Sequence, residues 1–237
     1  MSHRFWVVIP AAGSGRRMGT DIPKQYLPLN GRTVIEWTLS RFLDHSAIAG
    51  VVVAITDGDP YWQALNLSHP KLITTTGGTE RSDSVLNALH RLEQIASEND
   101  WVLVHDAARP CLTGEDLERM MVELKEHSVG GVLGSPMNDT VKRTNATGEV
   151  IETPDRSQLW RAFTPQMFRL KALTDALTTA AREGKAVTDD ASAMELAGFR
   201  PKMVMGRADN IKITQPGDLQ LAELYLKNCN DSKEQAK

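Results

Sequence analysis

A glycine-rich segment follows the first apolar run of the chain, and cations gather around it. It reads Pro-Ala-Ala-Gly-Ser-Gly-Arg-Arg-Met over residues 10–18, and Lys24 comes shortly after. Small residues and glycines let backbone N–H groups approach an anion closely. Arg16, Arg17 and Lys24 add positive charge at the same place, so the segment predicts a polyphosphate site. A solvated turn is the alternative interpretation; it would explain the cations but not the glycines.

The glycine segment matches neither of two common nucleotide motifs. A P-loop requires a Gly-Lys-Ser/Thr sequence, which does not follow here. Gly13, Gly15 and Gly19 have the spacing G-x-G-x-x-x-G, and no acidic residue ends the next predicted strand to hold a ribose. None of the three tyrosines has a lysine four residues later. An oxidoreductase is therefore disfavoured.

Two aspartates follow apolar runs further along the chain. Asp106 comes just after the run Trp101–Val104, and Asp209 lies in the segment Gly206–Lys212, again after a predicted strand. Magnesium is usually held by one or two carboxylates together with phosphate oxygens. The two aspartates predict a metal–triphosphate site, although an ordinary turn explains Asp209 equally well when it is taken alone.

Other polar segments carry weaker signals. Gly77–Ser84 opens a predicted helix and could line a base pocket, but helix capping is an equally simple reason for it. Thr188–Ser192 is a second helix start, and helix N-termini favour phosphate. His105 and Cys111 lack the partners that catalysis would need, so we interpret them as a structural hydrogen bonder and a buried thiol.

These segments come after short apolar runs that alternate with amphipathic stretches. The predicted strands are Phe5–Ile9, Val51–Ile55, Trp101–Val104, Gly131–Leu133 and Met203–Met205. Helical spacing of apolar residues begins at Ile35, Val85, Leu117 and Leu170, and a last helix starts at Thr214. The alternation predicts an α/β protein with an open, mostly parallel sheet and helices on both faces. Ligands of such sheets lie beyond the carboxyl ends of the strands.

The segment at about 136–160 interrupts the alternation. It predicts two short strands around the turn Asn145–Gly148. An isolated hairpin is only marginally stable. We therefore interpret the segment as a protruding β-hairpin arm that packs on a second subunit through Val141, Val150 and Ile151. A long surface excursion of a monomer is the alternative.

Composition limits the class of protein. The chain has 237 residues, of which 41% are hydrophobic and 24% charged, and a net charge of −3. We expect a single domain over residues 1–230, a disordered polar tail at 231–237, and no attraction to nucleic acid or an anionic membrane. Two cysteines without C-x-x-C spacing disfavour a disulfide scaffold. No apolar run reaches the ~18 residues of a membrane span, so we expect a soluble cytoplasmic protein.

In their order along the chain, these blocks together resemble the 2-C-methyl-D-erythritol 4-phosphate cytidylyltransferases. The resemblance implies a Rossmann-like fold and a homodimer joined by the arm. It also implies that CMP passes from CTP to methylerythritol 4-phosphate with Mg²⁺, releasing pyrophosphate, in the non-mevalonate route to isoprenoid precursors. The blocks that carry it are Pro10–Met18, Pro23–Tyr26, Val104–Pro110, Thr188–Ser192 and Arg207–Lys212.

The resemblance further implies roles for individual residues. Arg17 and Lys24 match two cations that stabilise the transition state, and Asp106 and Asp209 match an acidic pair near the metal and substrate. The implied nucleotide-binding residues are Ala11, Ala12, Gly13, Gly15, Gly78, Ser84, Asp106 and Ala107. The implied acceptor contacts are Thr188 and Lys212 from the same subunit, with Arg109, Thr140 and Arg156 offered across the dimer. The chain departs from the family pattern at Ser14 and Thr79, which bears on the base and ribose contacts.

The chemistry that these residues offer is electrostatic. A phosphate monoester has a second pKa of about 6, so such a nucleophile is already ionised at neutral pH and needs no general base. Two alternatives stay open: a cytidylyltransferase acting on another polyol phosphate, such as ribitol 5-phosphate, and a non-catalytic nucleotide-binding regulator.

Overall fold

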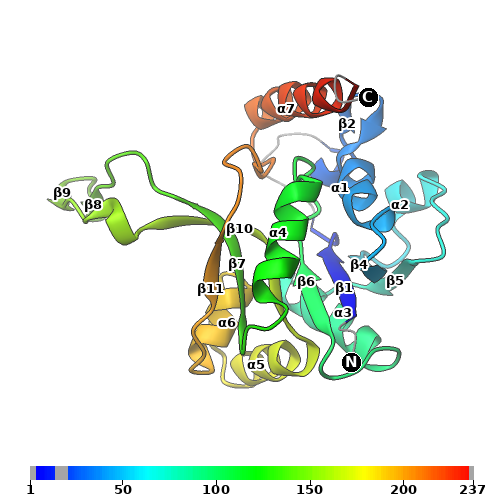
Figure 1. The fold of residues 1–237 in the computed structure, drawn as a ribbon, viewed down its shortest axis with the longest axis horizontal. Helices are drawn as coiled ribbons and strands as arrows, with labels where there is room; N and C mark the ends of the chain where they lie inside the picture. Colours follow the sequence, from blue (N-terminus) through cyan, green and yellow to red (C-terminus); the bar gives the residue numbers. More distant parts are fainter. Residues whose placement is uncertain (1–3, 14–20, 235–237) are drawn as a thin grey trace.

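Seven strands form one central sheet in the computed structural model, which describes residues 4–13 and 21–234, with side chains described up to Lys227 (Figure 1). The strand order is β11-β7-β10-β6-β1-β4-β5. Only β10 runs antiparallel to its neighbours, so the predicted mostly parallel sheet is confirmed. The strands are β1 (Phe5–Pro10), β4 (Ile48–Ile55), β5 (Leu72–Thr76), β6 (Trp101–Val104), β7 (Gly130–Pro136), β10 (Trp160–Arg169) and β11 (Lys202–Met205).

Helices cover both faces of the sheet, because alternate residues of each strand point to opposite sides. In β1, Val7 and Ile9 pack toward α1 (Val34–Leu43) and α4 (Gly114–Leu124). Trp6 and Val8 pack on the other face, toward α3, α5 and α6. Those three helices are Arg81–Glu93, Leu170–Arg182 and Asp190–Leu196. Burial on both faces is the reason that the central strands are continuously apolar.

The remaining elements are short, apart from the last helix. They are η2 (Lys24–Tyr26), β2 (Pro28–Leu29), β3 (Arg32–Thr33), α2 (Pro60–Ala64) and η3 (Arg156–Gln158). Helix α7 (Pro216–Glu234) packs Ala222 and Leu226 against Leu29 and Val34. The helix continues into the predicted tail, and residues 235–237 lie outside the described part of the chain.

The predicted arm is present and projects away from the body of the molecule (Figure 1). Its tip is an antiparallel pair of β8 (Arg143–Thr144) and β9 (Val150–Glu152). Val150 is 59% exposed and Ile151 is 62% exposed. The arm is the connection between β7 and β10, which are hydrogen-bonded neighbours in the sheet.

The apolar pattern of the sequence did not predict β5, β10 or α2. Strand β10 contains Arg161, Pro165 and Gln166, which break its apolar run, and it is held by pairing with both β6 and β7. No helix in the described part of the chain combines the length and the apolar character needed to cross a bilayer.

Candidate active site

One cleft of about 430 Å³ lies at the carboxyl ends of β1 and β6, where the fold rule places ligands. Its wall comes from the loops after these strands, the start of α3, and the segment between β11 and α7. The structure therefore brings together most of the predicted nucleotide-site residues, which are far apart in the sequence. The predicted site residues that line the cleft are Ala11, Ala12, Gly13, Lys24, Gly78, Ser84, Asp106, Ala107 and Lys212.

The start of the glycine segment is held in place by a side chain that the sequence did not single out. The buried amide of Gln25 donates hydrogen bonds to the carbonyls of Ala11 (2.8 Å) and Gly13 (3.1 Å). Lys24, the preceding residue, also lines the cleft. The other predicted residues of this segment, Gly15 and Arg17, lie outside the described residues.

Glycine is required at positions 77 and 78 of the cleft wall, because neighbouring atoms lie too close for a side chain. A Cβ on Gly77 would lie 2.4 Å from the Cβ of Ala12, and one on Gly78 would lie 2.3 Å from the Cβ of Asp83. The hydroxyl of Ser84 accepts a hydrogen bond from the Gly78 N–H (3.0 Å), which fixes the turn against α3. Capping also occurs, since the Asp83 carboxylate accepts from the Glu80 N–H. Pocket lining and helix capping are therefore both roles of this segment.

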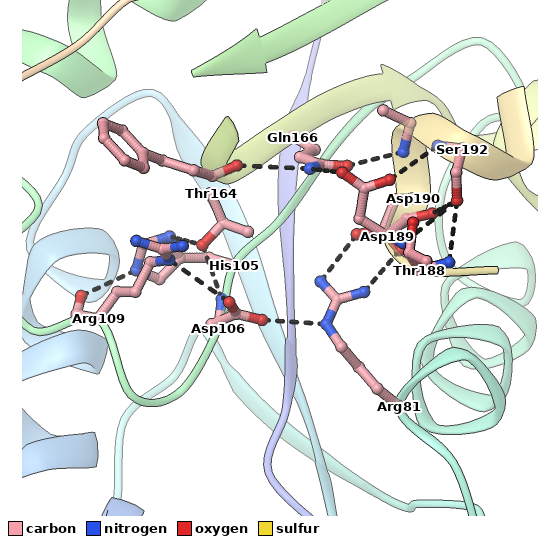
Figure 2. Close-up of polar contacts among 12 residues, drawn as sticks. Arg81, His105, Asp106, Arg109, Thr164, Gln166, Thr188, Asp189, Asp190 and Ser192 are labelled. Carbon is pink, nitrogen blue, oxygen red and sulfur yellow. Dashed lines mark hydrogen bonds and ion pairs between the residues drawn. The ribbon is translucent and has the colours of Figure 1, made fainter. Parts of the chain in front are cut away.

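Asp106 lines the cleft and contacts three cations, of which Arg81 and Arg109 are seen in Figure 2. Its Oδ1 accepts from Arg81 Nε at 3.0 Å, while its Oδ2 lies 2.9 Å from Lys212 Nζ and 3.4 Å from Arg109 Nε. The Asp106 N–H donates to the hydroxyl of Thr164 at 3.0 Å. Burial alone would raise the pKa of Asp106, but Arg81, Lys212 and Arg109 together lower it far below its usual range. The carboxylate is therefore ionised at neutral pH.

Arg109 is buried and bound within its own chain. Besides its contact with Asp106, its Nη1 donates to the carbonyl of Asn210 at 2.7 Å. The resemblance implies that Arg109 is offered across a dimer. These contacts favour a role inside its own subunit instead, where it holds Asp106.

Arg81 is a second residue, after Gln25, that sequence reasoning missed. Its Nη2 lies 2.8 Å from Asp190 Oδ2 and its Nη1 lies 3.3 Å from Asp190 Oδ1, so the guanidinium joins Asp190 to Asp106 (Figure 2). Burial raises the pKa of Asp190, and the charge of Arg81 opposes this rise. The only sequence signal was the position of Arg81 inside the Gly77–Ser84 loop, where a charged residue suggests a solvated helix start.

The predicted acceptor residue Thr188 is not in this cleft. It lines a second cleft of about 550 Å³, together with Glu80 and Arg81, which belong to both clefts. The Thr188 N–H donates to the hydroxyl of Ser192 at 3.1 Å, at the start of α6.

Four other predicted residues do not line the cleft either, and Arg109, described above, is one of them. Asp209 is not among the described residues that line it, and its carboxylate accepts from Arg207 Nε at 3.0 Å. Thr140 and Arg156 are exposed on the arm, where Arg156 donates to the carbonyl of Asn138. The cleft of a single chain therefore lacks the arm residues.

The carboxylates do not form a ready metal site. Both oxygens of Asp106 are engaged by cations, and Asp209 is engaged by Arg207. Among the described residues, no group of three His, Cys, Asp or Glu side chains is placed to hold a metal ion. The donor set thus does not fit a metal held by Asp106 and Asp209 together.

His105 and Cys111 are structural, as predicted. The imidazole of His105 is fully buried, its Nε2 lies 3.0 Å from the Arg109 carbonyl, and its Nδ1 lies 3.1 Å from the Thr164 hydroxyl. Burial lowers the pKa of His105 to about 4, so the ring is neutral at pH 7. The thiol of Cys111 is buried.

Comparison with known proteins identifies the family of the chain. Residues 5–228 match the family model described as "IspD: 2-C-methyl-D-erythritol 4-phosphate cytidylyltransferase". The enzyme of that name from Vibrio vulnificus (strain YJ016) is 50% identical over 227 residues, which cover 95% of this chain and 96% of the relative. The one from Pseudomonas aeruginosa (strain UCBPP-PA14) is 56% identical over 217 residues, covering 91% of this chain and 93% of the relative.

Solved structures agree with the sequence relatives. The crystal structure of the Francisella tularensis cytidylyltransferase is 37% identical, covers 94% of this chain and 99% of its own, and has a TM-score of 0.81. That of the Thermus thermophilus enzyme is 32% identical, covers 93% and 98%, and has a TM-score of 0.74. The resemblance seen in the sequence is confirmed: the chain belongs to the family of 2-C-methyl-D-erythritol 4-phosphate cytidylyltransferases.

Proposed function

We propose that the cleft binds CTP and transfers its CMP group to 2-C-methyl-D-erythritol 4-phosphate, with release of pyrophosphate. The chain is a nucleotidyltransferase of isoprenoid precursor synthesis, by the non-mevalonate route. One observation carries the assignment to this cleft: residues matched to the family's nucleotide site lie in widely separated parts of the sequence, yet line a single cavity.

The reaction joins two anions and needs no proton transfer. An oxygen of the acceptor phosphate attacks the α-phosphorus of CTP, and the bond from that phosphorus to the bridging oxygen of pyrophosphate breaks. The attacking phosphate is already a dianion at neutral pH, because its second pKa is about 6. His105 is consistent with this chemistry, since both ring nitrogens are hydrogen bonded inside the protein and the ring is neutral.

Cations carry the catalysis. Lys24 lines the cleft beside the glycine segment, and we assign to it the stabilisation of charge that develops on the five-coordinate phosphorus. We assign the same role to Arg17 on the resemblance alone. We assign the binding of the acceptor phosphate to Lys212, whose ammonium contacts Asp106 at the cleft.

We include Mg²⁺ in the proposal as an ion that enters with the triphosphate. It would reduce the charge of the leaving pyrophosphate. We derive no step from a metal bound by Asp106 and Asp209, because these carboxylates are engaged by cations.

We further propose that the enzyme works as a homodimer in the cytoplasm. Thr140 and Arg156 lie on the projecting arm, so in this arrangement they would reach the cleft of a second subunit. The exposed Val150 and Ile151 would be covered by the same contact, which would give the isolated hairpin the support it lacks.

The decisive assay follows pyrophosphate release. Purified enzyme with Mg²⁺ is given CTP, ATP, GTP or UTP in turn, each with methylerythritol 4-phosphate or ribitol 5-phosphate. We expect release with CTP and methylerythritol 4-phosphate, and none when the acceptor is omitted. A preference for ribitol 5-phosphate would reassign the acceptor. Nucleotide binding without any release would identify a regulator and overturn the proposal.

A further inference from the structure

We propose that Arg81 is a positioning residue of this reaction, which acts by fixing the carboxylate of Asp106 and is itself held by the buried carboxylate of Asp190. The inference rests on the proposed function, because it assigns to Asp106 a place among the bound substrates. It concerns one chain of ion pairs, in which the partly exposed Arg81 joins the two buried carboxylates of Asp190 and Asp106 (Figure 2).

The guanidinium of Arg81 is locked in place from behind the cleft. Both oxygens of Asp190 accept from its two terminal nitrogens, at 2.8 and 3.3 Å, in the fork arrangement that is specific to arginine. The Asp190 side chain is 1% exposed, and Asp190 is not among the described residues that line either cleft. Among the described residues, Arg81 is therefore the side chain through which Asp190 makes hydrogen-bonded contact with the cleft.

Arg81 fixes one particular oxygen of Asp106. In the described part of the chain, Arg109 and Lys212 both contact Oδ2, whereas Arg81 contacts Oδ1 at 3.0 Å. Two contacts on one oxygen leave the carboxylate free to pivot about it. The contact on the second oxygen sets the plane of the carboxylate, which is 9% exposed at the cleft. Without Arg81, Lys212 would remain attached to a carboxylate of undefined orientation.

Asp190 is in turn anchored by the start of α6. Gln166 on β10 donates to the Asp189 carboxylate at 2.8 Å and accepts from the Ala191 N–H at 2.7 Å, so the residues on either side of Asp190 are tied to the sheet. Asp189 also accepts from the Ser192 N–H at 2.9 Å. The chain of ion pairs thus begins on rigid backbone, which is what positioning within a fraction of an ångström requires.

The alternative is that Arg81 only joins α3 to α6 and contributes to stability. The two roles predict different kinetics. A structural role reduces the fraction of folded enzyme but leaves kcat/KM per folded molecule unchanged. A positioning role lowers kcat in enzyme that is fully folded, because misplacement of about 1 Å can reduce a rate by roughly 10²-fold.

The test is a double-mutant cycle on Arg81 and Asp106 in the full chain. The variants are Arg81→Lys, Asp106→Asn and the double variant, with kcat and KM for both substrates measured by pyrophosphate release. Arg81→Lys keeps the charge but cannot span both aspartates. We expect it to lower kcat/KM by about 10²-fold, mainly in kcat. We expect the double variant to match the more severe single variant, since residues that act as one unit are not additive.

Two further variants separate stability from positioning. Asp190→Asn weakens the hold on Arg81 without touching the cleft, and we expect it to lower kcat in the same way as Arg81→Lys. Asp190→Asn also tests the positioning role if the Arg81→Lys variant does not fold. Asp100→Asn is the matched control: this buried carboxylate accepts from Trp6 Nε1 and the Ser97 N–H at the opposite end of β6. We expect it to reduce stability to urea but not kcat/KM.

The outcomes distinguish the two proposals. If the unmodified enzyme releases no pyrophosphate from CTP and acceptor, the proposed function fails. If it is active but folded Arg81→Lys and Asp190→Asn keep their kcat, the positioning role is wrong. Multiplicative effects of the Arg81 and Asp106 substitutions would equally overturn it, since they would show that Arg81 does not act through Asp106.

Discussion

The buried imidazole of His105 leads to a prediction about stability and pH. Burial lowers its pKa from 6.5 to about 4 in the folded chain. In the unfolded chain the ring is in water and keeps its ordinary pKa. Protons therefore bind the unfolded chain in preference, so the contribution of His105 to stability is complete above pH 6.5 and is lost as the pH falls toward 4.

The size of this effect follows from the two pKa values. Their difference corresponds to about 3 kcal/mol of unfolding free energy when the protonated form is compared with the neutral one. Between pH 7 and pH 5, the folded protein loses about 2 kcal/mol of this unfolding free energy. That is a substantial part of the stability of an ordinary domain, which is about 5–15 kcal/mol.

The measurement compares urea unfolding of the unmodified enzyme and His105→Gln from pH 7 to pH 5. Glutamine can donate to the Arg109 carbonyl and accept from the Thr164 hydroxyl, as the ring does, but it does not titrate. We expect the unmodified enzyme to lose about 2 kcal/mol more than the variant over this range. Asp190, whose raised pKa acts in the opposite direction, is common to both proteins and cancels.

Parallel pH profiles for the two proteins would refute this reasoning. The same variant also tests the chemistry. Because His105 carries no proton in the reaction, we expect kcat to fall by less than about 10-fold, well short of the roughly 10²–10⁴-fold that general acid–base catalysis contributes. A larger loss would make His105 a catalytic group.

Three further predictions concern the cleft and the arm. Lys24→Ala should lower kcat by roughly 10²–10³-fold with little change in CTP binding, as for a lost oxyanion donor; unchanged turnover would exclude the role. Arg17→Ala should lower kcat by a similar factor, and Arg17→Lys should also lower it, because the guanidinium fork is lost; wild-type kcat in Arg17→Lys would show that charge alone suffices. Arg156→Ala should weaken acceptor binding and spare CTP, as titration calorimetry would show. Mixed dimers of Arg156→Ala and Lys24→Ala should recover one working site, and no recovery would contradict sharing across subunits.

The sequence predicted the frame of the protein through short-range patterns. Continuous apolar runs such as Trp101–Val104 mark strands buried on both faces, and the helices beside them show the spacing of an amphipathic surface. These patterns can be recognised in the sequence because each depends on the residues of one segment only. Strand β10 was missed because its place depends on pairing with β6 and β7, and its own residues do not form an apolar run.

The cleft itself was predictable for a related reason. In a parallel sheet the carboxyl ends of the strands share one edge, so segments after different strands meet without further information. The glycine segment, Asp106 and Lys212 follow predicted strands and were placed in this way, and Gly13, Asp106 and Lys212 line the cleft. The Gly77–Ser84 loop was predicted only as a helix start, because the strand before it was not predicted.

Tertiary structure alone decided the charge state and the partners of the site. Asp106 follows a strand in the sequence, but its low pKa comes from Arg81, Arg109 and Lys212, which approach from different elements. Arg81 and Asp190 are 109 positions apart in the sequence, and the residues around each of them do not predict their contact. Electrostatic energy depends on the distance between charges and on their burial in three dimensions, and neither quantity can be obtained from the order of the residues.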